Sequence, residues 1–213
     1  RKNSPGLDLT EQENIDELKL KLSKFDTSKI DAVSSLNRPV VENEVRSLCD
    51  GHLIGSLKFD DPKHIKTEIT SSLMNDAWAK TNIKHRAKIL NTVAALLQKN
   101  SDQLLYLLIH ETDKTIHDAW DELREAEDFL RFYSNEGIKL QSNSMELKGP
   151  TGELNELTYH PKGTFLCISP WNFPAAILIG QISAALITGN NVIAKPSELS
   201  SLIGFKIIEL FYA

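Results

Sequence analysis

Hydrophobic residues recur at helical spacing through the middle of the chain, from about residue 62 to residue 140. Asp61 and Pro62 have the form of a helix N-cap followed by a first-turn proline. Three further helices are expected to begin near Ile83, at the cap residue Ser101 and near Ile116. The apolar positions of the four helices are Ile65, Ile69, Leu73 and Trp78; Ala87, Leu90, Val93, Ala94 and Leu97; Leu104, Leu105, Leu107, Leu108 and Ile109; and Trp120, Leu123, Ala126, Phe129, Leu130 and Tyr133.

An acidic stripe lies opposite the apolar face of the last of these helices. Its carboxylates include Asp121, Glu122 and Glu125. Such a stripe is typical of a solvated helix face, and a role in a substrate channel is the alternative interpretation. Because no histidine lies at a ligand spacing beside these carboxylates, no metal site is predicted.

Residues 1–60 have a different pattern and are interpreted as an N-terminal arm or linker. Apolar residues recur among charged ones over residues 11–24, where Thr10 and Glu13 have the form of a capping box, so one amphipathic helix is expected there. Over residues 25–60 the periodicity fades, and glycines and Pro39 interrupt the chain. Extended or irregular backbone that crosses another surface is expected for this part.

Residues 154–160 alternate between apolar and polar side chains, which predicts a strand. The preceding segment, residues 142–153, is polar and contains glycine, so a loop is expected there. Pro161 and Gly163 separate the strand from the next apolar run, so that it can project and pair with another chain. His160 is interpreted as a surface or interface histidine.

The last fifty residues predict a strand–helix–strand–helix unit. Apolar runs over residues 164–169 and 191–194 have strand length, and the first is typical of a central parallel strand that is covered on both faces. An almost wholly apolar helix is expected over residues 175–187, and Ser197 or Ser200 can cap a last helix. This order is that of a crossover unit in a doubly wound parallel sheet.

Both strands end at turns that carry polar side chains. Pro170 to Pro174 follows the first strand and Lys195 to Glu198 follows the second. Because ligands bind beyond the carboxyl ends of parallel strands, both turns are expected to face one crevice.

Composition narrows the class of protein. The chain has 213 residues, 41% of them hydrophobic, so it can bury a core. Its formal net charge of −5 argues against the clustered positive charge that nucleic-acid-binding proteins carry. Proline and polar residues interrupt the most apolar region, residues 165–187, and no transmembrane segment is predicted. Two cysteines, Cys49 and Cys167, and no signal peptide favour a cytoplasmic protein with free structural thiols.

The two turns carry the motifs of a known family. The sequence from Ile168 to Pro174, followed by Gly189-Asn190 and Lys195-Pro196-Ser197-Glu198, closely resembles the aldehyde dehydrogenase superfamily. Within it, three further segments are similar to the bacterial bifunctional proline utilization A family. They are Gly149-Pro150-Thr151-Gly152-Glu153; Asp118-Ala119-Trp120 with Arg124-Glu125-Ala126; and Asn3-Ser4, Gly6 and Asp8-Leu9.

The resemblance implies an α/β fold, in which a helical N-terminal region leads into the first part of a doubly wound, Rossmann-like parallel sheet. The fold would be an incomplete aldehyde dehydrogenase fold. Residues 61–153 would be the helical part of an NAD-binding domain, 154–162 the strand of an oligomerisation flap, and 163–213 the first βαβα unit.

The resemblance also implies a chemistry. The family oxidises an aldehyde through a covalent adduct with a cysteine and transfers hydride to NAD. In the proline utilization A family the substrate is L-glutamate γ-semialdehyde, in equilibrium with pyrroline-5-carboxylate, and the product is glutamate; FAD belongs only to the proline dehydrogenase half, which is absent here. Asn172 would be the catalytic oxyanion donor. The cofactor contacts would be Ile168, Ser169, Pro170, Trp171, Lys195, Ser197 and Glu198.

The family's glycine-rich helix start, glutamate base and nucleophilic cysteine are expected beyond Ala213, so this chain alone is predicted to be inactive. Homo-oligomers, or pairing with a complementing chain, are expected through the strand over residues 154–160. Two alternatives stay open. One is a non-catalytic assembly or binding module from a split or decayed gene, and the other is an aldehyde dehydrogenase of different specificity.

Overall fold

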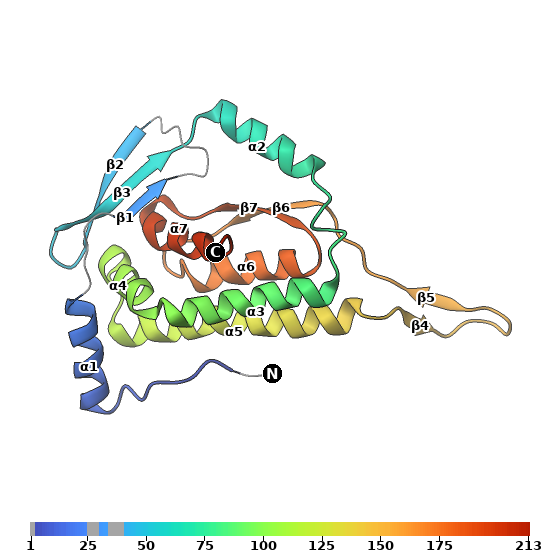
Figure 1. The fold of residues 1–213 in the computed structure, drawn as a ribbon, viewed down its shortest axis with the longest axis horizontal. Coiled ribbons are helices and arrows are strands. Elements are labelled where there is room, and N and C mark those ends of the chain that lie inside the picture. The colour runs from blue at the N-terminus through green and yellow to red at the C-terminus, as the bar shows by residue number, and fades with distance from the viewer. Residues whose placement is uncertain (1–2, 25–29, 34–40) are drawn as a thin grey trace.

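A computed structural model describes residues 3–24, 30–33 and 41–213 (Figure 1). Helices α3 and α5 form a layer on which α6 lies, and strands β6 and β7 lie on the other side of α6. The elements are α1 (Gln12–Ser23), β1 (Ile30–Val33), β2 (Val41–Arg46), β3 (Leu53–Phe59), α2 (Pro62–Met74), α3 (Ile83–Lys99), α4 (Ser101–Thr112), α5 (Ile116–Gln141), β4 (Met145–Leu147), β5 (Asn155–Leu157), β6 (Thr164–Ile168), α6 (Ala176–Ile187), β7 (Asn191–Lys195), the 3-10 turn η1 (Glu198–Ser200) and α7 (Ser201–Glu209).

The helical core confirms the four helices predicted from the apolar spacing. The predicted face of α3 is buried along its whole length, and the leucines of α4 are almost fully buried. Helices α5 and α6 approach closely at Gly137, where an added Cβ would lie 2.3 Å from Ile187 Cγ1. One detail of the prediction is wrong: Asn100, not Ser101, is the N-cap residue of α4.

Helix α1 confirms the predicted amphipathic helix, but the capping box does not form. Glu11 is the N-cap residue, and no side chain caps the helix. Thr10 instead donates from its backbone N and its Oγ1 to Asp8 Oδ1, at 2.9 and 2.6 Å. The backbone N–H of Thr10 therefore closes an Asx turn ahead of the helix, and the hydroxyl reinforces that turn rather than capping the helix.

The segment expected to be extended or irregular contains a small sheet, with β1 and β2 on either side of β3. Strand β2 pairs antiparallel with β3, and β1 pairs parallel with it. Ile54 in β3 is fully buried. Strands β1–β3 are therefore extended, one of the two forms expected, although their pairing into a sheet was not predicted. Residues 25–29 and 34–40, which include Pro39, lie outside the described residues.

Strands β6 and β7, which precede and follow α6 in the sequence, pair in parallel, as the apolar runs predicted. Gly189, at φ +89°, ends the connection from α6 in a backbone conformation that glycine adopts readily. The expectation that β6 is covered on both faces is wrong for the described residues. Cys167 is buried, but Leu166 and Ile168 are 60% and 55% exposed. Helix α2 meets this side of β6 at Thr164, whose Oγ1 donates to the carbonyl oxygen of Ser72 at 3.1 Å, and leaves those two side chains open.

The polar segment expected to be a loop contains strand β4, which pairs antiparallel with β5. Strand β5 confirms the strand predicted near residues 154–160, although it is shorter. The β4–β5 hairpin projects away from the rest of the molecule (Figure 1). Every residue from 142 to 160 except Asn155 is exposed, including the apolar Met145, Leu147, Leu154, Leu157 and Tyr159.

Helix α2 begins at the predicted cap, where Asp61 Oδ1 accepts from the backbone N of Lys63 at 2.8 Å. It ends at Met74, so the prediction that Trp78 continues its apolar face is wrong. The indole of Trp78 instead donates to the carbonyl oxygen of Leu186 at 2.8 Å. None of the helices that the structure describes is both long enough and apolar enough to cross a bilayer.

Candidate functional site

The two polar turns lie at the same edge of the β6–β7 pair. In the parallel register Ile168, the last residue of β6, lies opposite Lys195, the last residue of β7. The backbone N of Ser169 donates to the carbonyl oxygen of Lys195 at 3.3 Å, which ties the first turn to the second. The structure thus brings together the residues that the motifs predicted.

Asn172 lies in the first turn, between the end of β6 and the start of α6. Its side chain is exposed, as are those of Trp171 and Phe173, while Pro170 is partly buried. Within the described residues the Asn172 amide makes no hydrogen bond, so both its donors are available to a ligand. The N-terminus of α6 adds the positive end of a helix dipole close behind it.

A buried carboxylate that the sequence analysis placed in the solvated stripe holds this turn from behind. Glu122 Oε1 accepts from the backbone N of Ala175 at 2.7 Å and of Ala176 at 3.2 Å, and its Oε2 lies 3.1 Å from Lys114 Nζ. The Lys114 ammonium also lies 4.4 Å above the ring of Phe173. Glu122 therefore fixes the start of α6, and with it the turn that carries Asn172.

The assignment of Glu122 to a solvated face is wrong, whereas Asp121 and Glu125 are exposed as expected. Burial raises the pKa of the Glu122 carboxyl, and the N–H of Ala175 and the Lys114 ammonium oppose that rise. One sequence signal could have located it: Glu122 lies between Ala119 and Ala126 at spacings of three and four, on the face that is buried in α5.

Lys195 and Glu198 form an exposed ion pair in the second turn. Lys195 Nζ donates to Glu198 Oε2 at 3.3 Å and to the carbonyl oxygen of Pro196 at 3.3 Å. The backbone N–H of Glu198 and then the Lys195 ammonium lower the pKa of the Glu198 carboxyl, so it is ionised at neutral pH. The Lys195 ammonium can donate a hydrogen bond to one hydroxyl of a ribose, and the Glu198 carboxylate beside it can accept a hydrogen bond from the other.

The two predicted serine contacts lie deeper. Ser197 Oγ accepts from the backbone N of Leu199 at 3.2 Å and so caps η1, as the sequence allowed. Ser169 Oγ is buried and has no hydrogen-bond partner among the residues described. A buried hydroxyl without a partner is costly, which marks it as a group that a ligand or water can satisfy.

Neither thiol has the surroundings of a nucleophile. Cys167 is buried in β6, and burial raises its pKa. Cys49 is exposed, but partial burial and then Asp113 raise its pKa as well. Both cysteines are free, and both environments disfavour the thiolate that attacks a carbonyl.

The sequence profile described as "Aldehyde dehydrogenase family" matches residues 40–213. The chain belongs to the aldehyde dehydrogenase family. The resemblance recognised from the two turns is thereby confirmed, and the matched segment includes every element from β2 to α7.

Curated members of the family that are similar to this chain include two kinds of protein. Bifunctional protein PutA of Klebsiella aerogenes is 34% identical over 208 residues, which is 95% of this chain and 15% of that protein. The 1-pyrroline-5-carboxylate dehydrogenase of Bacillus subtilis is 36% identical over 135 residues, which is 63% of this chain and 26% of that enzyme. The chain therefore spans only a minor part of the length of these relatives.

Solved aldehyde dehydrogenase structures share the fold. A proline utilization A variant from Bradyrhizobium japonicum matches with a TM-score of 0.79 at 32% identity, over 100% of this chain and 19% of that one. A 1-pyrroline-5-carboxylate dehydrogenase from Thermus, solved with bound NAD, matches with a TM-score of 0.83 at 24% identity. The match covers 100% of this chain and 42% of that one. The predicted fold class, the N-terminal part of an aldehyde dehydrogenase fold, is confirmed.

Proposed function

We propose that these residues form the first part of the NAD-binding domain of an NAD-dependent L-glutamate γ-semialdehyde dehydrogenase in proline catabolism. Membership of the aldehyde dehydrogenase family supports the reaction class. The match to PutA over 95% of the chain supports the substrate. The observation that carries the proposal is that Asn172 and the Lys195–Glu198 pair lie at one edge of a parallel strand pair.

The second turn holds the adenosine ribose of NAD in this proposal. Lys195 donates to one hydroxyl and Glu198 accepts from the other, while Ser197 and the backbone from Ile168 to Trp171 line the groove. The Glu198 carboxylate repels a 2′-phosphate, so NAD is preferred to NADP. The bound cofactor supplies the hydride acceptor.

Asn172 acts on the substrate. Its amide donates a hydrogen bond to the aldehyde oxygen, and that bond strengthens as the oxygen becomes an anion. Glu122 holds the start of α6 and thereby keeps the amide in position. Glu122 is a positioning residue, because it acts through the turn and not on the substrate.

The 213 residues alone do not oxidise aldehydes in this proposal. The covalent step needs a thiolate beside the oxyanion donor, and the surroundings of Cys49 and Cys167 disfavour the thiolate. Purified chain mixed with NAD and pyrroline-5-carboxylate is expected to produce no NADH above the level without protein. Steady NADH formation would contradict this part of the proposal.

A chimera tests the proposed reaction. Residues 40–213 replace the structurally equivalent segment of the Thermus 1-pyrroline-5-carboxylate dehydrogenase, which supplies the rest of the fold. The chimera is expected to reduce NAD with pyrroline-5-carboxylate and to favour it over acetaldehyde and benzaldehyde. A chimera that has a native-like circular dichroism spectrum and binds NAD, yet oxidises no aldehyde, would contradict the proposal.

The proposal includes contact with another chain through the β4–β5 hairpin. Strand β5 pairs only with β4 among the described residues, so its outer edge is open to a further strand. The exposed Leu154, Leu157 and Tyr159 would add apolar contacts at that edge. Sedimentation of the chimera with and without Leu157→Lys tests this, and an unchanged oligomer in the variant would count against it.

A further inference from the structure

Two histidines and an aspartate outside the dehydrogenase site converge at the other end of the molecule. Asp50, His52 and His110 each offer one ligand atom, and these atoms lie within 4.8 Å of one another. The two imidazole rings meet edge to face, with their centroids 5.3 Å apart. Nothing in the proposed dehydrogenase chemistry uses these three side chains.

Two elements far apart in the sequence hold the cluster together. Asp50 and His52 lie in the tight turn between β2 and β3, where Gly51 has a φ of +78° and Ser47 N donates to the carbonyl oxygen of His52 at 2.9 Å. His110 lies near the end of α4. The backbone N of Leu48 donates to the carbonyl oxygen of His110 at 2.8 Å, which fixes the turn to the helix.

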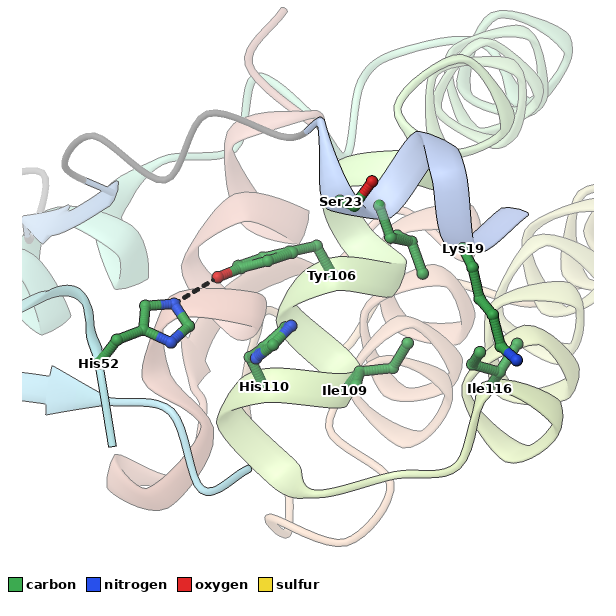
Figure 2. A pocket seen from close by; sticks show the side chains of 8 residues that line it. Lys19, Ser23, His52, Tyr106, Ile109, His110 and Ile116 are labelled. Carbon is green, nitrogen blue, oxygen red and sulfur yellow. Dashed lines mark hydrogen bonds between the residues drawn. The ribbon is translucent and has the colours of Figure 1, made fainter. Parts of the chain in front are cut away.

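Neighbouring hydroxyls orient both imidazoles, and Figure 2 shows the bond between Tyr106 and His52. Tyr106 Oη lies 2.7 Å from His52 Nε2, and Ser47 Oγ lies 3.0 Å from His110 Nδ1. A hydroxyl can donate or accept, so the Tyr106 bond survives either tautomer of His52. When the His52 proton is on Nε2, the lone pair of His52 Nδ1 faces Asp50 Oδ1, 2.5 Å away. A cation would be bound by both of these atoms. Metal-binding histidines are commonly held by such an outer hydrogen bond.

We propose that Asp50, His52 and His110 bind a zinc ion. Two imidazoles and a carboxylate are the donor set of a zinc site that keeps one position open. Tetrahedral zinc requires ligand atoms about 3.3 Å apart. Asp50 Oδ1 and His52 Nδ1, 2.5 Å apart, must therefore separate by roughly 1 Å, and pairs as wide as 4.8 Å must close by up to about 1.5 Å. Asp50 and His52 can make this movement because 57% and 36% of their side chains are exposed.

His52 and His110 line a pocket of about 500 Å³, which leaves room for a fourth ligand. Figure 2 shows His52, Tyr106 and His110 on one side of it and Lys19, from α1, on the other. A water molecule in the fourth position completes the tetrahedron. The ion joins the β2–β3 turn to α4, so binding stabilises the attachment of the small sheet to the helical core.

Zinc titration of the metal-free 213-residue chain by calorimetry tests the site. One equivalent of Zn²⁺ is expected to bind and to raise the midpoint of thermal unfolding, because the ion binds only the folded cluster. Mg²⁺ at the same concentration is expected to do neither, because it prefers oxygen ligands. Co²⁺ in place of Zn²⁺ is expected to give the visible absorption bands of a tetrahedral ion.

The variants separate this cluster from other zinc ligands. His52→Ala and His110→Ala are each expected to weaken binding by at least about tenfold, and Tyr106→Phe by about tenfold through the lost outer bond. The exposed His85 on α3 is the matched control, and His85→Ala is expected to bind like the unmodified chain. Asp50→Asn changes an exposed side chain, so it is expected to fold. It tests the site in place of a histidine variant that does not fold, and it is expected to weaken Zn²⁺ binding.

Three results would overturn the proposal. The first is that the folded chain binds no stoichiometric Zn²⁺. The second is that His52→Ala and His110→Ala both bind Zn²⁺ as tightly as the unmodified chain. If the histidine variants do not fold, the third is that Asp50→Asn and Tyr106→Phe both bind it as tightly as the unmodified chain. None of these results bears on the dehydrogenase proposal, because the cluster shares no residue with the edge of the β6–β7 pair.

Discussion

Among the individual residues, Asn172 carries the largest expected effect on catalysis. Asn172→Ala in the chimera removes a hydrogen-bond donor that is most valuable in the transition state, so kcat is expected to fall by about 10²–10³. KM is expected to change much less, because the bond contributes little to ground-state binding. Steady-state kinetics with pyrroline-5-carboxylate at saturating NAD measure both constants.

Asn143 provides the control for this prediction. It is an exposed asparagine in the loop before β4, outside the predicted site. Asn143→Ala should therefore leave kcat unchanged. If Asn172→Ala lowers kcat no more than Asn143→Ala does, Asn172 is a turn residue and not an oxyanion donor.

Glu198 sets cofactor choice in the proposed site. Its carboxylate is ionised at neutral pH and exposed, so it meets the 2′-position of a bound dinucleotide as a negative charge. Glu198→Gln in the chimera is expected to raise kcat/KM for NADP relative to NAD by about tenfold, since the repulsion is lost. Glu209→Gln is the control, because it breaks a Lys–Glu pair of the same spacing on α7 and should leave the NADP-to-NAD ratio of kcat/KM unchanged. If the two variants give the same ratio, Glu198 does not set the cofactor preference.

At the scale of elements, the start of α6 depends on a side chain from α5. Glu122→Ala leaves the buried N–H groups of Ala175 and Ala176 without their acceptor and leaves Lys114 without its partner. The free energy of unfolding is expected to fall by about 1–3 kcal/mol, measured by urea denaturation. Glu125→Ala, on the exposed face of the same helix, should change it by less than about 0.5 kcal/mol. Equal losses in the two variants would show that Glu122 does not hold the helix.

The start of α7 has a similar arrangement that makes stability depend on pH. Glu111 on α4 accepts from the backbone N of Leu202 and Ile203, both at 2.8 Å. Burial raises the pKa of its carboxyl from 4.5 to about 7, against the opposing effect of these N–H groups. The folded state therefore binds more protons than the unfolded state between these values, and stability falls as the pH rises from 4.5 through 7.

The loss amounts to at most about 3 kcal/mol for such a shift. Urea denaturation at the two ends of this pH range measures it. Glu111→Gln cannot ionise and is expected to remove most of the difference, whereas Glu125→Gln should retain it. A pH dependence that is the same in Glu111→Gln as in the unmodified chain would rule out Glu111 as its source.

The sequence predicted elements best where packing follows one period. Helices α3 and α5 have apolar faces that repeat over many turns, and the structure confirms them. The sheet of β1–β3 was missed because the strands are short and pair only through contacts that the sequence pattern does not display, and half of the residues in β2 are charged. The same limit applies to β4, which is a strand only because β5 pairs with it.

Part of the candidate site could also be predicted from the sequence. Asn172, Lys195 and Glu198 follow apolar runs of strand length, and parallel pairing brings the ends of such strands to one edge. Glu122 was assigned wrongly because a carboxylate is usually solvated, and its partners are backbone N–H groups that a sequence pattern does not display. The Asp50, His52 and His110 cluster was missed because its two elements are brought together only by the fold.

For the molecule as a whole, the exposed side of the β6–β7 pair favours association. Leu166 and Ile168, which lie on one face of β6, are 60% and 55% exposed. Exposed apolar side chains beside a strand edge that is unpaired among the described residues are typical of a surface that another chain covers. The purified 213-residue chain is therefore expected to self-associate, with a sedimentation coefficient that rises with protein concentration.

Leu166→Lys places a charge in the middle of this face and is expected to shift the chain toward the monomer at every concentration. Leu20→Lys is the control, because Leu20 is 54% exposed on α1, at a distance from the strand pair, and its replacement should leave the association unchanged. A chain that stays monomeric throughout the concentration series would show that the exposed face does not drive association. Association that persists equally in both variants would assign it to another surface, such as the β4–β5 hairpin.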